Sequence, residues 1–324
     1  MQLHGSTVML AGGAGFLGSN FARRLLAEDV RRLWIVDNFQ TGRRSNLAAL
    51  AMDARVEIVE HDIVETLPAS LQAERADLVL NLACAASPPQ YQADPVHTFR
   101  TSIWGNWNLA QYAMRHGARV LFTSTSEVYG DPECHPQSES YRGSVNVNGI
   151  RACYDEGKRG GETLLCDLAR MHPFQVRIAR IFNTYGPWMD PSDGRVVSNF
   201  IVQALQGQAL TMYGDGAQTR SFCYVDDMIE GLLRLALSEG QLNALPVNLG
   251  NEQEFTLREL VQALEQVMGR SLPLEHQPLP SDDPRKRRPD LTRARTLLGW
   301  EPRVPLVQGL GPTIEYFRSE LAAR

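Results

Sequence analysis

The chain has 324 residues, of which 43% are hydrophobic and 21% charged, and its formal net charge is −5. This composition is typical of a globular protein with one large or two smaller domains, and the acidic balance argues against a nucleic-acid partner. The N-terminal apolar stretch is too short and too rich in glycine to span a membrane, and it lacks the basic start of a signal peptide. Five widely spaced cysteines without a C-x-x-C pair argue against a disulfide framework, so we expect a cytoplasmic protein, and we predict no metal site.

Apolar runs rich in β-branched residues alternate with segments of helical period from residue 6 to about residue 183. The runs are TVMLAGG, LWIVDN, VEIVEHD, DLVLNLA, RVLFTSTS and FQVRIARIFN. Alternation of this kind is typical of parallel strands joined by crossover helices that cover both faces of the sheet. The sequence therefore predicts an α/β fold with a doubly wound parallel sheet of the Rossmann type.

The pattern becomes irregular after Asn183, where proline and glycine interrupt it more often. A loop, TYGPWMDPSDGR, precedes a predicted helix near 195–206, strand candidates LTMYG and SFCYV, and a second helix over 226–237. We expect residues 1–183, with parts of 220–250, to form the sheet domain. Residues 184–324 should mainly form a smaller lobe at the carboxyl edge of the sheet.

A glycine-rich turn follows the first run directly, with Gly12, Gly15 and Gly18 in a G-x-x-G-x-x-G pattern before a helical segment. Glycines there allow a tight turn and close approach of the backbone to a pyrophosphate, which the free N–H groups of the helix start can bind. Asp37 ends the second run, 19 residues after Gly18. Its carboxylate can accept the ribose hydroxyls of NAD and would repel the 2′-phosphate of NADP.

Other polar residues near this turn allow more than one interpretation. Arg43 and Arg44 can serve a phosphate, hold the adenine side of NAD or lie in solvent. Asp62 ends the third run, where it can meet the adenine or remain a solvated acid at a strand end.

Tyr154 and Lys158 are four residues apart in a segment of helical period, ACYDEGKRGGETLLCDLARMH, and therefore share one helix face. A nearby ammonium favours the phenolate, so we expect Lys158 to lower the pKa of Tyr154 and make it a base for an alcohol proton. The residues between and beside them, Asp155, Glu156 and Arg159, are expected at the surface or in packing.

The fifth run ends in Thr125, Ser126 and Glu127, at the sheet edge where doubly wound folds bind ligands. A hydroxyl there can bond a reacting oxygen, and the acid can bind water or move a proton. A polar strand end that caps a helix is the simpler alternative.

These motifs together resemble the extended short-chain dehydrogenase/reductases, and most closely the UDP-glucuronate decarboxylase (UDP-xylose synthase) family. The likeness covers nearly the whole chain and is carried by GGAGFLGS, DNFQTGR, NLACAASPPQYQ, STSEVYGDP, ACYDEGKR, RIFNTYGP, GRVVSNFI, GDGAQTRSFCYVDD and DDPRKRRPD. The glycine turn and Y-x-x-x-K mark the superfamily, whereas T-S-E with ACYDEGKR and DDPRKRRPD resemble the decarboxylases in particular.

The resemblance implies NAD-dependent conversion of UDP-glucuronate to UDP-xylose through a UDP-4-keto intermediate, in a homodimer built on the helix of Tyr154 and a helix around 95–115. It implies that the catalytic residues are Thr125, Ser126, Glu127, Tyr154, Lys158 and Arg287. The implied NAD contacts are Gly12, Gly15, Phe16, Leu17, Gly18, Asp37, Asn38, Thr41, Gly42, Asp62, Ile63, Leu82, Ala83, Tyr154 and Lys158. The implied sugar-nucleotide contacts are Asn183, Val197, Asn199, Tyr213, Arg220 and Arg287.

Three departures from the family pattern leave the outcome of the reaction open: Ala85, Ser102 and the stretch NVNG before Arg151. They leave release of UDP-4-keto-xylose as a possible partial product. A sugar-nucleotide 4-epimerase or 4,6-dehydratase is the alternative enzyme, against which Ser126 and Arg287 weigh. A non-catalytic NAD-sensing protein is the alternative from another class, but it would not require Thr125, Tyr154 and Lys158 together.

Overall fold

A seven-stranded parallel sheet forms the centre of the molecule in the computed structural model, which describes residues 1–278 and 287–323. The strand order is β11-β6-β5-β4-β1-β2-β3. Six strands are the predicted runs, and β11 lies within residues 220–250. Their bounds are β1 Thr7–Ala11, β2 Arg32–Asp37, β3 Val56–Glu60, β4 Leu78–Asn81, β5 Arg119–Thr125, β6 Val176–Ile181 and β11 Pro246–Leu249.

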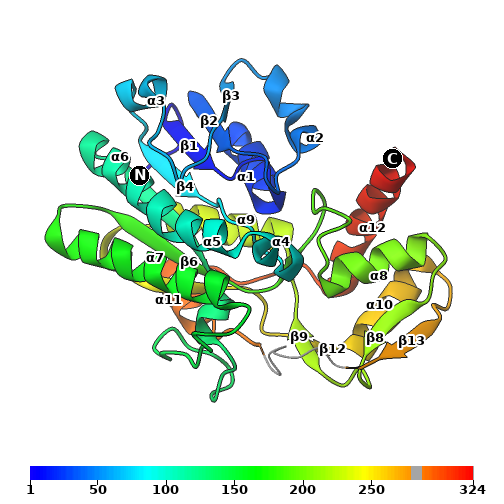
Figure 1. Cartoon of the computed structure of the whole chain (residues 1–324). Helices are drawn as coiled ribbons and strands as arrows, with labels where there is room; N and C mark the ends of the chain where they lie inside the picture. The colour runs from blue at the N-terminus through cyan, green and yellow to red at the C-terminus, as the bar shows by residue number, and fades with distance from the viewer. Residues whose placement is uncertain (279–286, 324) are drawn as a thin grey trace.

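Helices cover both faces of this sheet because neighbouring residues of each strand point to opposite sides. Val8 and Leu10 of β1 pack with α1 (Phe16–Ala27) and α9 (Val225–Leu237). Met9 and Ala11 pack on the other side with α3 (Ala69–Ala73), α6 (Asn106–His116) and α7 (Ala152–Met171). The predicted doubly wound Rossmann fold is therefore confirmed (Figure 1).

The helix expected around 95–115 is interrupted. It consists of α5 (Pro95–Arg100), a π-helical turn η2 (Thr101–Gly105) and α6. Glycines of α7 face this segment, and a Cβ added at Gly161 would lie 2.9 Å from the Ser102 carbonyl oxygen. This close packing fixes α7, and with it Tyr154, against the helix that follows β4.

Short strands from the second half of the chain, with α8, α10 and α12, form a layer at the carboxyl edge of the sheet, on the right in Figure 1, whereas α11 packs against α9 and β11. The strand pairs are β8 with β13, β9 with β12 and β7 with β10. The predicted helix near 195–206 and the strand in LTMYG are confirmed, whereas SFCYV is divided between two strands. The bounds are β7 Thr184–Tyr185, α8 Val196–Leu205, β8 Leu210–Tyr213, β9 Thr219–Ser221, β10 Cys223–Tyr224, β12 Glu254–Thr256, α10 Leu257–Met268, β13 Leu274–Gln277, α11 Thr292–Leu298 and α12 Leu306–Ala322.

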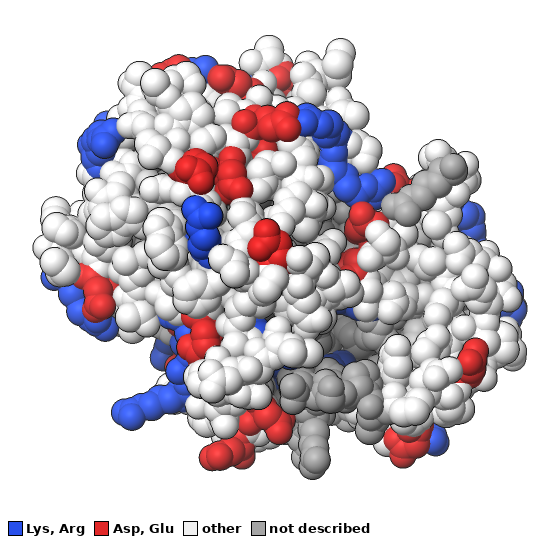
Figure 2. Space-filling view, viewed as in Figure 1, with Lys and Arg blue, Asp and Glu red and all other residues white. Residues whose placement is uncertain are grey.

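Short elements complete the chain: α2 Arg44–Leu47, η1 Leu50–Met52, α4 Pro88–Ala93, η3 Ser126–Tyr129 and η4 Gly240–Leu242. Of the helices in the described part of the chain, none combines the length and the apolar character needed to cross a membrane. All five cysteines are free, and the described residues contain no cluster of three or more potential metal-binding side chains. Acidic and basic side chains are interspersed on the face drawn in Figure 2.

Candidate active site

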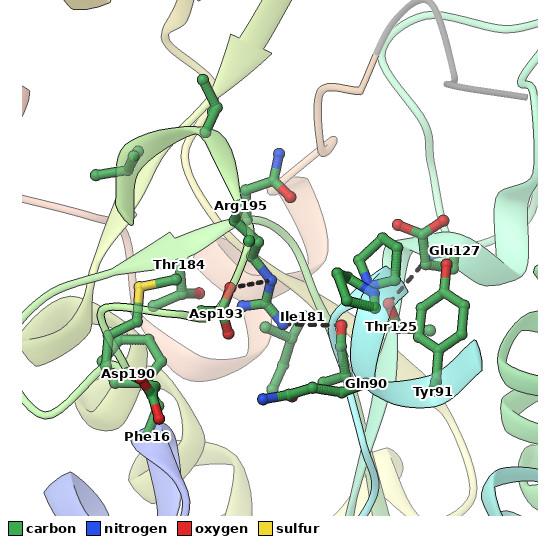
Figure 3. A pocket seen from close by; sticks show the side chains of 18 of the residues that line it. Phe16, Gln90, Tyr91, Thr125, Glu127, Ile181, Thr184, Asp190, Asp193 and Arg195 are labelled. Carbon is green, nitrogen blue, oxygen red and sulfur yellow. Dashed lines mark hydrogen bonds and ion pairs between the residues drawn. The ribbon is translucent and has the colours of Figure 1, made fainter. Parts of the chain in front are cut away.

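A cavity of about 770 Å³ lies where the carboxyl ends of β1, β5 and β6 meet the second half of the chain. Its wall includes the glycine turn at one end and the T-S-E strand end with Tyr154 at the other. Figure 3 shows Thr125, Glu127 and Tyr91 on one side of it, with Asp190, Asp193 and Arg195 opposite. Ligands of doubly wound sheets bind at this edge, so the cavity is the candidate active site.

The glycine turn is shaped by backbone contacts that a side chain would prevent. Gly12 has φ +79°, and a Cβ there would lie 2.6 Å from the backbone of Leu82 and Ala83. A Cβ at Gly18 would lie 2.0 Å from the Gly12 carbonyl oxygen. Helix α1 begins at Phe16 without a side-chain cap, so its first N–H groups remain available to an anion. This turn fits the pyrophosphate of NAD.

Asp37 lies beneath the turn and is only 7% exposed. Its carboxylate accepts hydrogen bonds from the Ala14 and Phe39 amides, each at 2.8 Å. Burial raises the pKa of Asp37, while these two N–H donors lower it. The carboxylate thus fixes the turn, and its predicted contact with ribose stays a prediction.

The other predicted NAD residues fall into two groups. The cavity wall includes Gly12, Gly15, Phe16, Leu17, Gly18, Thr41, Leu82, Tyr154 and Lys158. Within the described chain, Asp37, Asn38, Gly42, Asp62, Ile63 and Ala83 lie outside that wall. Asp62 there accepts a hydrogen bond from Asn38 at 3.0 Å and pairs with the His97 ring at 2.7 Å.

Tyr154 and Lys158 project from α7 into the cavity wall and are both buried, at 6% and 3% exposure. The Lys158 ammonium donates to the Thr123 carbonyl at 2.9 Å and lies 5.8 Å from the centroid of the Tyr154 ring. Thr125 hydrogen-bonds the Tyr154 phenol. The structure therefore brings the predicted pair and the end of β5 together.

The pKa of the Tyr154 phenol is decided mainly by burial and not by the neighbouring lysine. Burial raises the pKa of Tyr154, as does Cys84, whereas Thr125 and Arg195 lower it. Burial also lowers the pKa of Lys158. The prediction of a lowered phenol pKa was wrong for the protein alone, because loss of hydration disfavours both charged forms.

Tyr91 of α4 stacks on the Tyr154 ring and was not predicted. The Tyr91 and Tyr154 rings lie 5.1 Å apart at an interplanar angle of 5°. Burial raises the pKa of Tyr91 to about 12. Its hydroxyl is buried and has no hydrogen-bond partner among the described residues, which makes it available to a ligand. The sequence carries no spacing signal for this contact, since Tyr91 lies 63 positions before Tyr154.

Glu127 is held by two arginines. Arg287 forms a two-point ion pair with it, in which Nη2 donates to Oε2 at 2.6 Å, and Arg151 donates to the same oxygen at 2.5 Å. Arg287 is 5% exposed, and burial lowers its pKa to about 10. Arg151 was not predicted, although its position one helical turn before Tyr154 was a usable signal.

The remaining predicted site residues also line the cavity. Ser126 is buried at the start of η3. The six predicted sugar-nucleotide residues, Asn183, Val197, Asn199, Tyr213, Arg220 and Arg287, all belong to the wall. Residues 282–286 of the motif DDPRKRRPD, like the first two residues of the basic run 285–288, lie outside the described residues.

Asp193 and Arg195 extend the wall and were missed. Arg195 pairs with Asp193 at 3.3 Å and donates to the Ala86 carbonyl at 2.8 Å, which joins the loop before α8 to the loop after β4 (Figure 3). Among the departures from the family pattern, Ala85 packs against Tyr91 and Tyr154, and the Ser102 hydroxyl lies 3.6 Å from the Cys84 sulfur. NVNG forms an exposed turn closed by the Gly149 amide.

The glycine turn after β1 and the buried tyrosine–lysine pair beside β5 define an extended short-chain dehydrogenase/reductase. Residues 8–250 match the NAD dependent epimerase/dehydratase family. The chain belongs to this family.

Proteins similar to this chain include several that act on UDP-glucuronic acid by name. UDP-glucuronic acid decarboxylase 5 of Arabidopsis thaliana is 48% identical over 97% of this chain and 90% of its own length. UDP-glucuronic acid decarboxylase 1 of Danio rerio is 48% identical over 97% of this chain and 73% of its own. UDP-glucuronic acid 4-epimerase from Bacillus cereus, solved with UDP-glucuronic acid and NAD, has a TM-score of 0.88 at 25% identity over 97% of this chain and 99% of its own.

Proposed function

We propose that the chain catalyses the NAD-dependent decarboxylation of UDP-glucuronate to UDP-xylose. Relatives at 48% identity over nearly the whole chain are UDP-glucuronic acid decarboxylases. The observation that carries the proposal is the pair of arginines, Arg151 and Arg287, on Glu127 in the wall that also holds Tyr154. Arginine recognises carboxylates through its planar fork, so this end of the cavity suits a uronic acid.

Residues at the end of β5 and on α7 remove the proton from the sugar 4-hydroxyl. The glycine turn would hold NAD, which would supply reversible hydride transfer at C4 and the positive charge of its oxidised ring. Tyr154 takes the hydroxyl proton, with Thr125 bonded to its phenol. Lys158 keeps a cation beside the phenol ring. Because burial raises the pKa of Tyr154, these cationic neighbours are needed to make it a base near neutral pH.

The arginines and Glu127 act on the other side of the sugar. Arg151 and Arg287 can release Glu127 and bind the substrate carboxylate instead. The negative charge of Glu127 repels that second carboxylate. Oxidation at C4 makes the substrate a β-keto acid, whose carboxylate leaves as CO₂ while the ketone oxygen takes up the electrons. Tyr154 stabilises that oxyanion. In this proposal Glu127, Ser126 and Arg287 would lie beside C5, which takes up a proton after CO₂ has left.

The division of labour between the two parts of the chain is also a proposal. Residues 1–183, with parts of 220–250, would bind NAD, and residues 184–324 mainly the sugar nucleotide. The predicted NAD contacts precede residue 160, and the predicted sugar-nucleotide contacts begin at Asn183, the last residue of the first part.

Incubation with UDP-glucuronate tests the function. We expect stoichiometric release of CO₂ and a UDP-pentose, identified by mass spectrometry and NMR. A UDP-hexuronate product without CO₂ would identify a 4-epimerase instead, and no reaction with bound NAD would favour a sensing protein. The ratio of UDP-xylose to UDP-4-keto-xylose is read from the same spectra.

We also propose a cytoplasmic homodimer. Four large apolar side chains are exposed on consecutive elements α5, η2 and α6, next to α7: Val96, Phe99, Trp104 and Trp107. Five free thiols suit a reducing compartment. Trp104→Glu should convert a dimer to monomers in analytical ultracentrifugation, while Val307→Glu on α12, equally a change at an exposed apolar position, should not. A monomeric unmodified chain would contradict the proposal.

A further inference from the structure

The cavity wall at the glycine-turn end is assembled from parts of the chain that lie far apart in sequence. Arg43 comes from the loop after β2 and Asn46 from the adjoining short helix α2, whereas Trp188, Met189 and Asp190 come from the segment between β7 and α8. Two segments that are distant in sequence therefore contribute to the wall at this end of the cavity. A dinucleotide held at the turn would therefore have both segments beside it.

Arg43 joins the first segment to the C-terminal helix. Its amide donates to the Ala14 carbonyl of the glycine turn at 3.0 Å, which fixes its backbone. Its guanidinium is paired with Glu320 of α12 and has its Nε 3.9 Å from the Asp190 carboxylate. Both Arg43 and Glu320 are about one-fifth exposed, at 21% and 20%, so solvent screens this pair only in part.

Trp188 joins the second segment to α1, to α12 and, through Asn46, to the glycine turn. The Arg23 guanidinium of α1 lies 3.5 Å above its ring, and the Tyr316 ring of α12 lies 5.3 Å away. The Asn46 amide donates to the carbonyl oxygens of both Ala14 and Trp188. Trp188 has φ +71°, a left-handed conformation that a bulky residue keeps only where its surroundings hold it.

We propose that Glu320 is a positioning residue that acts through Arg43 to keep the two segments closed over the cofactor. This inference rests on the proposed function and concerns the return of hydride. Loss of the reduced cofactor before that return leaves UDP-4-keto-pentose, with one CO₂ and one NADH formed for each UDP-glucuronate and NAD consumed. Closure at Arg43 and Glu320 would thus set the ratio of UDP-xylose to the ketone.

Glu320→Gln tests the proposal, because it removes the charge and keeps the shape of a side chain outside the cavity wall. We expect the rate of NAD dissociation, measured without substrate by trapping released NAD with a coupled dehydrogenase, to rise about tenfold, the factor that one charge-assisted hydrogen bond represents. The ketone share of the product should rise in parallel. Glu320→Asp, which keeps the charge, should restore most of the retention.

The chain offers a matched control on the same helix, Glu315→Gln, which breaks an exposed pair with Arg318. It should leave NAD dissociation and the product ratio unchanged. Equal NAD dissociation in Glu320→Gln and wild type, or an equal rise in both glutamine variants, would overturn the proposal. A wild-type chain that releases no CO₂ would instead contradict the proposed function, while the NAD dissociation rates would still test the closure.

Discussion

The two ends of the cavity are built in different ways. The glycine turn itself is made of seven consecutive residues, 12–18, and depends on backbone atoms that approach one another closely. The catalytic end is made of side chains from four separate segments, represented by Tyr91, Thr125 to Glu127, Arg151 to Lys158, and Arg287. The motif of the turn is therefore contiguous in sequence, whereas the catalytic end exists only after separate segments have packed together.

The energetics of the two ends differ accordingly. At the turn, an added methyl group meets backbone that cannot move away. At the catalytic end, burial of charged side chains is offset by their partners, as for Glu127 with Arg287. Removal of one partner there leaves the other buried without compensation, which typically costs about 3–5 kcal/mol. Substitutions should consequently affect cofactor retention at one end and turnover at the other.

Tyr154→Phe should have the largest effect on turnover and the smallest on cofactor binding. The phenol is the proposed base, and its loss should lower the rate of CO₂ release by about 10³-fold, within the range of general-base catalysis. Stacking against Tyr91 is retained by phenylalanine. NAD content, measured after gel filtration, should match wild type; activity within tenfold of wild type would refute the assignment of the base.

Gly18→Ala should have the opposite effect to Tyr154→Phe, with its main loss in cofactor retention. Its Cβ would lie 2.0 Å from the Gly12 carbonyl oxygen, so the turn must open and NAD retention should fall, with a lower Tm. Gly311→Ala on α12 is the matched control, because no atom lies within 4 Å of its added Cβ. It should leave NAD content unchanged, but without the usual gain in stability of a helical Gly→Ala, because Pro312 follows and disfavours a Cβ at the preceding helical residue. Normal NAD content in Gly18→Ala would show that the close approach is not needed.

Arg287→Ala and Arg151→Ala should both slow decarboxylation, but unequally. Arg287 is the more buried, with 6% of its side chain exposed against 19% for Arg151. We expect about 100-fold loss of kcat/KM for Arg287→Ala and about tenfold, mainly through KM, for Arg151→Ala. Arg170→Ala, on the same helix and 71% exposed, is the control and should change neither constant. Equal losses at the two positions would mean that burial does not decide the contribution.

The sequence could predict the glycine turn itself, but the rest of that end and the catalytic end only in part. G-x-x-G-x-x-G specifies the turn because its residues are contiguous, and Tyr154 and Lys158 share a face through helical period alone. Tyr91 carries no such signal, because its place depends on the tight packing of the segments after β4 against α7. Likewise, nothing local to Glu127 indicates that an arginine 160 positions later neutralises it.

Electrostatics set a further limit on prediction from sequence. The phenol pKa was expected to fall because a lysine is near, but it rises, since burial of the whole pair decides the sign. Asp155 was expected at the surface or in packing beside two charged neighbours; it is 7% exposed, and one of its carboxylate oxygens has no partner in the described part of the chain. Burial is a property of the folded molecule, so such shifts cannot be derived from spacing.

Asp155 gives the smallest of the predicted effects on turnover, because its effect is on stability instead. Burial raises its pKa from 3.8 to about 7, with Glu156 acting in the same direction and Arg151 opposing them. Between these two values the folded chain keeps a proton that the unfolded chain has lost. The contribution of this carboxyl to stability is therefore fully present below about pH 4 and is lost as the pH rises through 7.

Asp155→Asn, which is neutral at every pH, should thus be more stable than wild type at pH 8, by at most about 4 kcal/mol. The difference should shrink steadily as the pH falls toward 4 in urea unfolding experiments. Asp167→Asn on the same helix, where the carboxylate is 54% exposed beside Arg170, should show no such trend. A gain in stability that does not depend on pH, or a loss of stability at pH 8, would contradict this prediction. Either result would mean that the folded protein compensates the charge of Asp155, as it compensates the charges of the buried arginines.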